Sequence, residues 1–185
     1  MKGEWAIWKD AFSSEECDSI LERGKNLPVN QANQGLNGEN PDLTYRRSKV
    51  KWMHEDIYRD VFEKMWSMTN KVNRDFFGFH IDNLEYMQLT EYHEVDKGEY
   101  KRHHDIFWLN GQEKQRKLSV VLQLTDPKTY EGGRLSLEVQ NQKPFDYFEK
   151  GTVIWFPSFV EHWVTPVTKG IRNSVVCWFE GPHWR

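Results

Sequence analysis

Two short stretches of the sequence place histidine next to aspartate at a spacing that could bind a metal. "GEYKRHHDIFW" contains His103-His104-Asp105, and "FGFHIDN" contains His80-Ile81-Asp82. Imidazole and carboxylate together can ligate a transition metal or act as an acid–base pair. The His-x-Asp pattern alone is a weak signal, because the chain has seven histidines and such spacing arises by chance.

A third candidate ligand follows later in the chain. If the first stretch is a β-strand, His103 and Asp105 point to one face and His104 to the other. His162 lies at the edge of a predicted strand after a proline-containing turn, in "GTVIWFPSFVEHWV". Two histidines and one carboxylate on one face of a metal leave open positions, the arrangement associated with non-haem Fe(II) oxygenases.

Arg172 offers a second kind of chemistry near the same place. The letters "VTKG" before it predict a turn between two strands, so the chain would double back towards the metal site. A guanidinium binds a carboxylate through two parallel hydrogen bonds. A dicarboxylate that reaches from the metal to Arg172 would explain both features, whereas Arg172 alone would be an ordinary surface residue after a turn.

The elements that must position these residues change in character along the chain. "FSSEECDSILERGKNLP" predicts a helix, with Ser13 and Glu16 as a capping box. A second helix is predicted from about Glu55 to Asn73, because apolar residues recur there at helical spacing. The polar stretch Asn30 to Asp42 between them is predicted to be a loop.

Short β-rich segments dominate the rest of the sequence, with about eight between His80 and Gly181. Many short strands after a helical opening predict a mainly β protein with supporting α-helices: a double-stranded β-helix, or jelly roll of the cupin type, with the N-terminal helices packed on one sheet. The expected organisation is a single domain over 1–185. Residues 1–79 would form the helical support and loop, and residues 80–183 the jelly-roll core.

The composition limits the partners and the compartment. The formal net charge is −3, which gives no electrostatic case for binding nucleic acid. The two cysteines, Cys17 and Cys177, are expected to be free thiols in a reducing compartment. The first residues show no signal-peptide pattern and no segment is apolar enough to span a membrane. We therefore expect a soluble, cytoplasmic protein without a membrane partner, compatible with a monomer.

At the level of ordered motifs, most of the chain resembles the Fe(II)- and 2-oxoglutarate-dependent dioxygenases. The similarity is to the prolyl 4-hydroxylase-like branch, which includes the small PKHD-type hydroxylases. Tyr92 followed by Gly98, Tyr100, His103 and Asp105 resembles the family's Tyr…Gly-x-Tyr-x-x-His-x-Asp pattern. "KLSVVLQLTDPKTYEGGRLSLE" and "GTVIWFPSFVEHWVTPVTKGIRNSVVCW" resemble its central and closing segments.

The resemblance implies roles for six residues. Fe(II) would be ligated by His103, Asp105 and His162. Arg172 would pair with the distal carboxylate of 2-oxoglutarate, where many prolyl hydroxylases have Lys and the PKHD-type branch has Arg. The remaining pocket residues implied by the resemblance are Tyr92, which would line the co-substrate pocket, and Gln123, which would face it.

The activity implied by the resemblance is hydroxylation of a prolyl residue in a peptide or protein to 4-hydroxyproline. O₂ and 2-oxoglutarate would be consumed and succinate and CO₂ released, with ascorbate as a candidate reductant. The stretch Asn30 to Asp42 could close over the peptide. Two other functions stay open: hydroxylation of a free amino acid or other small molecule, and a non-catalytic jelly-roll binding module. The acidic balance disfavours a nucleic-acid demethylase.

Overall fold

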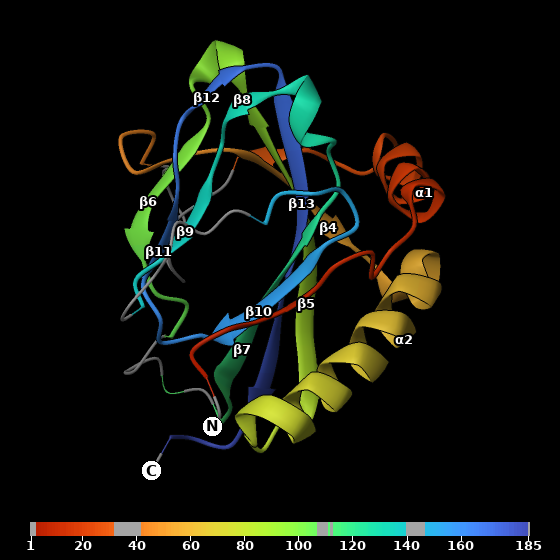
Figure 1. Cartoon of the computed structure of the whole chain (residues 1–185), viewed down its shortest axis with the longest axis vertical. Helices are drawn as coiled ribbons and strands as arrows, with labels where there is room; N and C mark the ends of the chain where they lie inside the picture. The colour runs from red at the N-terminus through yellow and green to blue at the C-terminus, as the bar shows by residue number, and fades with distance from the viewer. Residues whose placement is uncertain (1–2, 32–41, 107–110, 112, 140–146, 185) are drawn as a thin grey trace.

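The computed structural model describes residues 3–31, 42–106, 111, 113–139 and 147–184. It is mainly β, with antiparallel sheets and two α-helices packed against one of them (Figure 1), as predicted from the sequence. The helices are α1 (Ser14–Gly24) and α2 (Glu55–Val72), with a π-helical turn η1 (Asn73–Phe77) and 3-10 turns η2 (Glu94–Asp96) and η3 (Pro127–Thr129).

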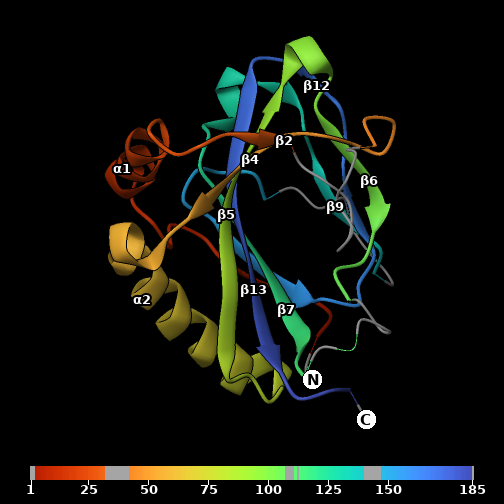
Figure 2. The same cartoon turned by 180° about the vertical axis from the view of Figure 1, so that it is seen from behind.

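A seven-stranded major sheet forms one wall of the molecule, in the order β1-β10-β7-β13-β5-β4-β2. Its long central strand β13 pairs with β5 on one side and β7 on the other, as Figure 2 shows from behind. The strands are β1 (Ala6–Trp8), β2 (Asn30–Gln31), β4 (Lys49–Met53), β5 (Asn83–His93), β7 (Gln115–Gln123), β10 (Val153–Pro157) and β13 (Ile171–Gly181).

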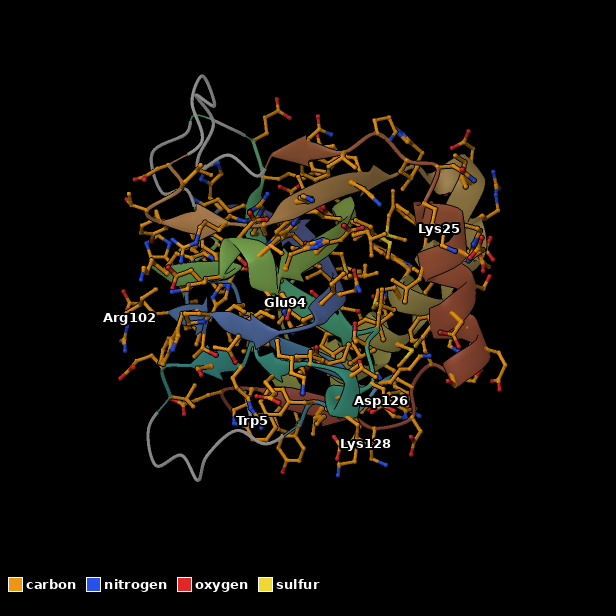
Figure 3. The ribbon with its side chains drawn as sticks, turned by 90° about the horizontal axis from the view of Figure 1, so that it is seen from above. Trp5, Lys25, Glu94, Arg102, Asp126 and Lys128 are labelled. Carbon is orange, nitrogen blue, oxygen red and sulfur yellow. The ribbon has the colours of Figure 1, made fainter. Side chains whose placement is uncertain are left out.

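A four-stranded minor sheet faces it, in the order β3-β6-β11-β9, and β12 pairs with β8 in a separate two-stranded ladder. These strands are β3 (Arg46–Arg47), β6 (Glu99–His103), β8 (Glu131–Gly132), β9 (Leu135–Leu137), β11 (His162–Val164) and β12 (Val167–Lys169). In Figure 3, Arg102 of β6 and Lys25 at the end of α1 lie on opposite sides of the molecule. The helices therefore leave the minor sheet uncovered.

The helices bury their apolar stripes against the outer face of the major sheet. Ser13 caps α1, because its Oγ accepts from the Glu16 amide at 3.2 Å and Glu16 Oε2 accepts from the Ser13 amide at 2.7 Å. Trp155 of β10 donates from its indole to Thr69 of α2 at 2.9 Å. The core of this layer includes Cys17, Ile20, Val61, Met65, Met87, Leu89, Leu118, Val120, Leu122, Cys177 and Phe179.

Strand alternation directs the other side chains of the same strands into the space between the sheets. On β7, Leu118, Val120 and Leu122 face the helices, while Val121 belongs to a second buried cluster. That interior cluster includes Tyr92, Val121, Leu135, Leu137, Ile154, Phe156, Val160, Val164 and Val167. Because both faces of the central strands are buried, the jelly-roll interior is a rigid setting for polar side chains.

The N-terminal region contains more β structure than the sequence indicated. Residues 1–79 were expected to supply helices and a loop, yet β1 and β4 extend the major sheet through pairing with β10 and β5. Asn30 and Gln31, predicted as loop, form β2 on the edge of that sheet. The rest of the predicted loop, residues 32–41, lies outside the described residues. In the described part of the chain, no helix is long and apolar enough to cross a membrane.

Candidate metal centre and co-substrate pocket

The structure brings His103, Asp105 and His162 together, with their potential ligand atoms within 4.8 Å of one another. His103 and His162 are register partners on β6 and β11 of the minor sheet. Their Nε2 atoms lie 3.7 Å and 3.6 Å from the two carboxylate oxygens of Asp105. Two imidazole nitrogens and one carboxylate match the facial set that holds Fe(II) in non-haem oxygenases.

Backbone carbonyls set which nitrogen of each histidine faces this cluster. His103 Nδ1 lies 2.8 Å from the Lys101 carbonyl, and His162 Nδ1 lies 3.0 Å from the Val160 carbonyl. A carbonyl only accepts, so Nδ1 carries the proton and the Nε2 lone pair is left for a metal.

The backbone at Asp105 differs from the continuous strand that was predicted. Strand β6 ends at His103, and Asp105 lies in a bend rather than on a continuing strand. Its amide donates to the Ser158 carbonyl at 2.8 Å, directly after β10 of the major sheet. The chain therefore crosses from one sheet towards the other at this point. The exposed His104 lies outside the cluster.

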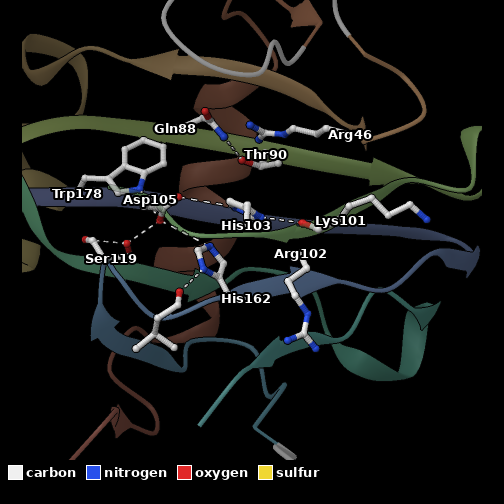
Figure 4. A network of polar contacts seen from close by, with 12 residues as sticks. Arg46, Gln88, Thr90, Lys101, Arg102, His103, Asp105, Ser119, His162 and Trp178 are labelled. Atoms are coloured by element: carbon white, nitrogen blue, oxygen red, sulfur yellow. Dashed lines mark hydrogen bonds and ion pairs between the residues drawn. The ribbon is translucent and has the colours of Figure 1, made fainter. Parts of the chain in front are cut away.

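Two residues outside the predicted site set hold one oxygen of this carboxylate. Ser119 Oγ donates to Asp105 Oδ2 at 2.6 Å, and Trp178 Nε1 donates to the same oxygen at 2.8 Å (Figure 4). Ser158 Oγ lies 3.0 Å from Ser119 Oγ and extends the network. A small polar residue among the apolar residues of β7, in phase with Gln123, was the signal that could have identified Ser119.

The electrostatics of the cluster favour the forms that bind a cation. Burial, reinforced by the neighbouring His162, lowers the pKa of His103, so its imidazole is neutral. Burial opposes ionisation of Asp105, but His162 and His103 outweigh it and lower the pKa of this carboxyl. A neutral His103 imidazole beside an ionised carboxylate is ready for a divalent metal without prior deprotonation.

A second group of polar residues lies on the interior face of the major sheet. Arg172 on β13 is only 1% exposed and donates through Nη2 to Gln123 Oε1 on β7 at 3.0 Å. Tyr92 on β5 is its register partner, and the Arg172 guanidinium carbon lies 5.5 Å from the centre of the Tyr92 ring. The structure thus places all three residues predicted for the co-substrate pocket side by side.

This group has donors without acceptors. Arg172 Nε and Gln123 Nε2 are both buried and find no hydrogen-bond partner in the described structure. Among the described residues, no carboxylate forms an ion pair with Arg172. A buried, uncompensated cation is costly, so the orphaned Nε of Arg172 and the neighbouring Gln123 amide fit an anionic ligand that accepts from both.

The two groups lie along the same interior wall. Ser119, which contacts the metal-site carboxylate, and Gln123, which contacts Arg172, are on the same face of β7 and four residues apart. Their backbones are therefore about 13 Å apart. The Tyr100 ring stacks on His103 with centroids 3.5 Å apart and packs against the interior cluster that contains Tyr92. A small dicarboxylate between long inward-pointing side chains can occupy that span.

Other sequence candidates lie elsewhere. Asp82 of the second His-x-Asp forms an ion pair with Lys114 at 2.8 Å and is outside the cluster. The predicted turn over Val167–Gly170 is largely strand β12, which pairs with β8, and only Gly170 (φ +73°) makes the reversal. Cys17 and Cys177 are free, as expected, and both are buried.

Comparison with known proteins agrees with this geometry. The family model of the 2OG-Fe(II) oxygenase superfamily matches residues 87–180, slightly more than half of the chain. A PKHD-type hydroxylase of Pseudoalteromonas atlantica is 44% identical over 63 residues, 34% of this chain and 28% of that protein. One from Rippkaea orientalis is 39% identical over 82 residues, 44% of this chain and 37% of that protein. The matches thus span well under half the length of these curated relatives.

Solved structures share the fold over nearly the whole chain. A prolyl-4-hydroxylase from Pseudomonas putida superposes with a TM-score of 0.76 at 19% identity, covering 97% of this chain and 94% of that one. A prolyl hydroxylase from Trichoplax adhaerens, in complex with a hypoxia inducible factor peptide fragment, gives a TM-score of 0.75 at 17% identity, covering 95% and 83%. With the family model matching across the metal cluster and Arg172, the chain belongs to the 2OG-Fe(II) oxygenase superfamily.

Proposed function

We propose that this chain hydroxylates a prolyl residue of a peptide or protein, with Fe(II) and 2-oxoglutarate in the site described above. Membership of the superfamily implies Fe(II), 2-oxoglutarate and O₂. The choice of a prolyl substrate is supported by the prolyl hydroxylases that share the fold, one of which holds a peptide. Ascorbate is proposed only as a reductant that keeps the metal ferrous.

One observation carries the proposal. A metal set of two histidines on the minor sheet and Asp105 in the following bend faces an interior in which Arg172 Nε and Gln123 Nε2 have no acceptor in the described structure. A metal site alone would fit many enzymes, and a buried arginine alone could be structural. Together they define a ligand with an anionic end at Arg172 and another metal-binding end, which is the chemistry of 2-oxoglutarate.

The chain's own residues would bind and orient the reactants. Bound Fe(II) would supply the activation of O₂ that couples co-substrate decarboxylation to hydroxylation. His103, Asp105 and His162 would hold the metal through two imidazole nitrogens and one carboxylate. Arg172 and Gln123 would fix the distal carboxylate, so that the co-substrate is oriented before reaction. The buried interior cluster would exclude water from the reacting centre.

The direct test measures succinate and substrate mass together. Purified chain with Fe(II), 2-oxoglutarate and O₂ is expected to form succinate, and a library of proline-containing peptides is expected to yield members heavier by one oxygen. His162→Ala should lose both metal binding and turnover. His104→Ala, an exposed histidine beside the cluster, is the matched control and should retain both.

The same assay separates the alternatives. If free amino acids stimulate succinate formation and peptides do not, the chain is a small-molecule hydroxylase on this scaffold. No co-substrate turnover, with metal affinity unchanged in His162→Ala, would favour a non-catalytic binding module. Hydroxylated peptide whose fragment spectrum places the oxygen on a residue other than proline would contradict the prolyl assignment while leaving the oxygenase intact.

A further inference from the structure

An aromatic hollow lies at the edge of the major sheet, apart from the metal and co-substrate residues. It has a volume of about 550 Å³ and is lined by Pro28, Asn30, Trp52, Met53, His54, Tyr86 and Met87. Trp52 is 40% exposed and Tyr86 56% exposed, and their rings meet edge to face with centroids 5.6 Å apart. Large exposed aromatic side chains in a hollow are typical of binding surfaces.

Strand alternation places the Trp52 and Tyr86 rings of this hollow on the same face of the sheet as the metal site, whereas Met53 and Met87 point to the helix side. Trp52 pairs with Gln88 across β4 and β5, and Gln88 pairs with Val176 across β5 and β13. Two residues beyond Val176 on the same face, Trp178 donates to the metal-site carboxylate. Figure 4 shows Gln88 and Thr90 beside Trp178 and His103 along this wall. The exposed rings of the hollow therefore lie at the outer end of the sheet face that also carries Trp178, with the buried Gln88 between them.

The lining defines the chemistry of an occupant. Its described members are apolar or aromatic, apart from the Asn30 amide and the His54 imidazole, and none carries a carboxylate, ammonium or guanidinium group. Four other tryptophan rings are each covered by a cation: Trp8 by Lys71, Trp163 by Arg102, Trp178 by Arg116 and Trp184 by Lys117. In the described structure no cation covers Trp52. Its ring is therefore open to a ligand, and the uncharged lining favours an apolar side chain, because a charged one would lose hydration without gaining a partner.

We propose that the Trp52–Tyr86 hollow is a second subsite for the peptide substrate, which takes an apolar side chain at a fixed distance from the hydroxylated residue. The inference rests on the proposed function, because the distance is counted from the target proline. From β13 to β4 is two strand spacings, about 10 Å, and an extended peptide advances about 3.3 Å per residue. With the step from the metal to Trp178, the apolar residue falls roughly three to five positions from the target.

A positional peptide scan tests this subsite. Fluorescent peptides with one central proline in a Gly/Ser/Ala background would carry a single leucine at each position from six before to six after it. Binding is measured by anisotropy without O₂, with Fe(II) and 2-oxoglutarate present. One offset, or two neighbouring ones, should tighten binding about tenfold, as expected for one well-placed apolar group. Aspartate at that offset should abolish the gain.

Variants of the chain then localise the effect. Trp52→Ala and Tyr86→Ala should each remove the leucine gain while leaving succinate formation without peptide unchanged. Val95→Ala, an 81% exposed apolar residue on η2, is the control and should keep the gain. Two variants on different strands guard against misfolding of either one, which circular dichroism would reveal.

The outcomes separate this inference from the proposed function. The subsite alone is overturned if prolyl hydroxylation occurs and does not depend on leucine position. It is also overturned if Trp52→Ala and Tyr86→Ala keep the wild-type dependence on leucine position. Leucine-dependent binding without any oxygen added to proline overturns the prolyl assignment and leaves the subsite standing. No binding of any peptide overturns the subsite. So does a dimer in sedimentation that Trp52→Ala dissociates, because a second copy of the chain would then be the occupant.

Discussion

The carboxylate of Asp105 shows how one side chain is divided between the protein and a metal. Ser119 and Trp178 both donate to Oδ2, while Oδ1 is the oxygen nearest His103 Nε2. Donors on one oxygen fix the plane of the carboxylate and leave the other oxygen for a metal. Both donors come from the major sheet, so they also connect the two sheets at the site.

Removal of either donor should weaken metal binding without unfolding the chain. We expect Ser119→Ala and Trp178→Phe each to raise the dissociation constant for Co(II) or Fe(II) about tenfold, the effect usual for such supporting hydrogen bonds. Competition with a chromogenic chelator measures this. Ser136→Ala on β9 and Trp8→Phe on β1, which do not contact Asp105, are the controls. Unchanged affinity in both test variants would show that Asp105 is positioned by its backbone alone.

Arg172 is a buried cation that has no carboxylate partner in the described structure. Its burial therefore destabilises the folded chain until an anion binds beside it. Replacing it with methionine should raise the dissociation constant for 2-oxoglutarate about thirtyfold or more, because the ligand's carboxylate loses its buried partner. Arg172→Lys should recover only part of the affinity, since an ammonium lacks the planar fork of donors. Thermal shift in the presence of increasing 2-oxoglutarate measures both.

The ligand-free stability of the same variant provides a second readout. Because the methionine variant loses an uncompensated buried charge, its Tm without ligand should be no lower than that of the wild type. Gln123→Ala removes a single hydrogen bond and should weaken 2-oxoglutarate binding less than Arg172→Met does. A ligand-free Tm that drops by many degrees in Arg172→Met would assign the arginine to the fold rather than to the co-substrate.

At the scale of elements, the turn between β8 and β9 makes room for this arginine. Gly132 and Gly133 both have positive φ, and a Cβ on Gly133 would lie 3.0 Å from Arg172 Cδ and 2.9 Å from Val167 Cγ2. Gly133 therefore permits the backbone turn and also leaves space for the guanidinium stem.

Gly133→Ala should consequently damage the site as well as the turn. Gly78→Ala is the matched control, because Gly78 has φ +73° and nothing within 4 Å of its Cβ position. Both variants should lose about 1 kcal/mol of stability from the left-handed backbone. Only Gly133→Ala should also weaken 2-oxoglutarate binding, as judged by the ligand-induced rise in Tm. Equal ligand-induced rises in the two variants would mean that the Arg172 stem shifts at no cost.

The elements also show what the sequence could and could not reveal. The capping box at Ser13 and the apolar stripe of α2 are local patterns, and the structure has them as predicted. The short strands β1 and β4 escaped notice because three to five residues carry little periodicity. The bend at Asp105 depends on a bond to Ser158 across the fold, and only the closed jelly roll brings these residues together.

For the whole molecule, charge pairs join separate elements and give its stability a pH dependence. Arg23 of α1 pairs with Asp60 of α2 at 2.9 Å, and Lys64 of α2 pairs with Glu16 of α1 at 2.6 Å. The hydrogen bonds of these pairs lower the pKa values of Asp60 and Glu16. Both pairs are at the surface, so each contributes little alone.

The Lys51–Glu91 pair between β4 and β5 is better shielded. Its atoms are 2.7 Å apart, the two side chains are 9% and 18% exposed, and His93 Nε2 lies 3.1 Å from the other Glu91 oxygen. Burial would raise the pKa of Glu91, but hydrogen bonds with Lys51 and His93 outweigh it and hold the pKa below its ordinary value of 4.5. A carboxyl whose pKa is lowered by folding stabilises the protein above pH 4.5, and this contribution is lost as the pH falls further.

Metal-free chain, kept with a chelator so that protonation of the metal ligands does not interfere, should therefore lose Tm steeply below about pH 4.5. Glu91→Gln should lower the Tm at pH 7, and its difference from the wild type should shrink as the pH falls towards 3, because the wild-type carboxyl becomes neutral too. Glu131→Gln changes a pair whose side chains are 70% and 65% exposed, and should follow the wild-type profile. A difference between Glu91→Gln and the wild type that stays constant from pH 7 to pH 3 would show that the shape of this side chain, rather than its ionisation, joins β4 to β5 at the edge of the sheet.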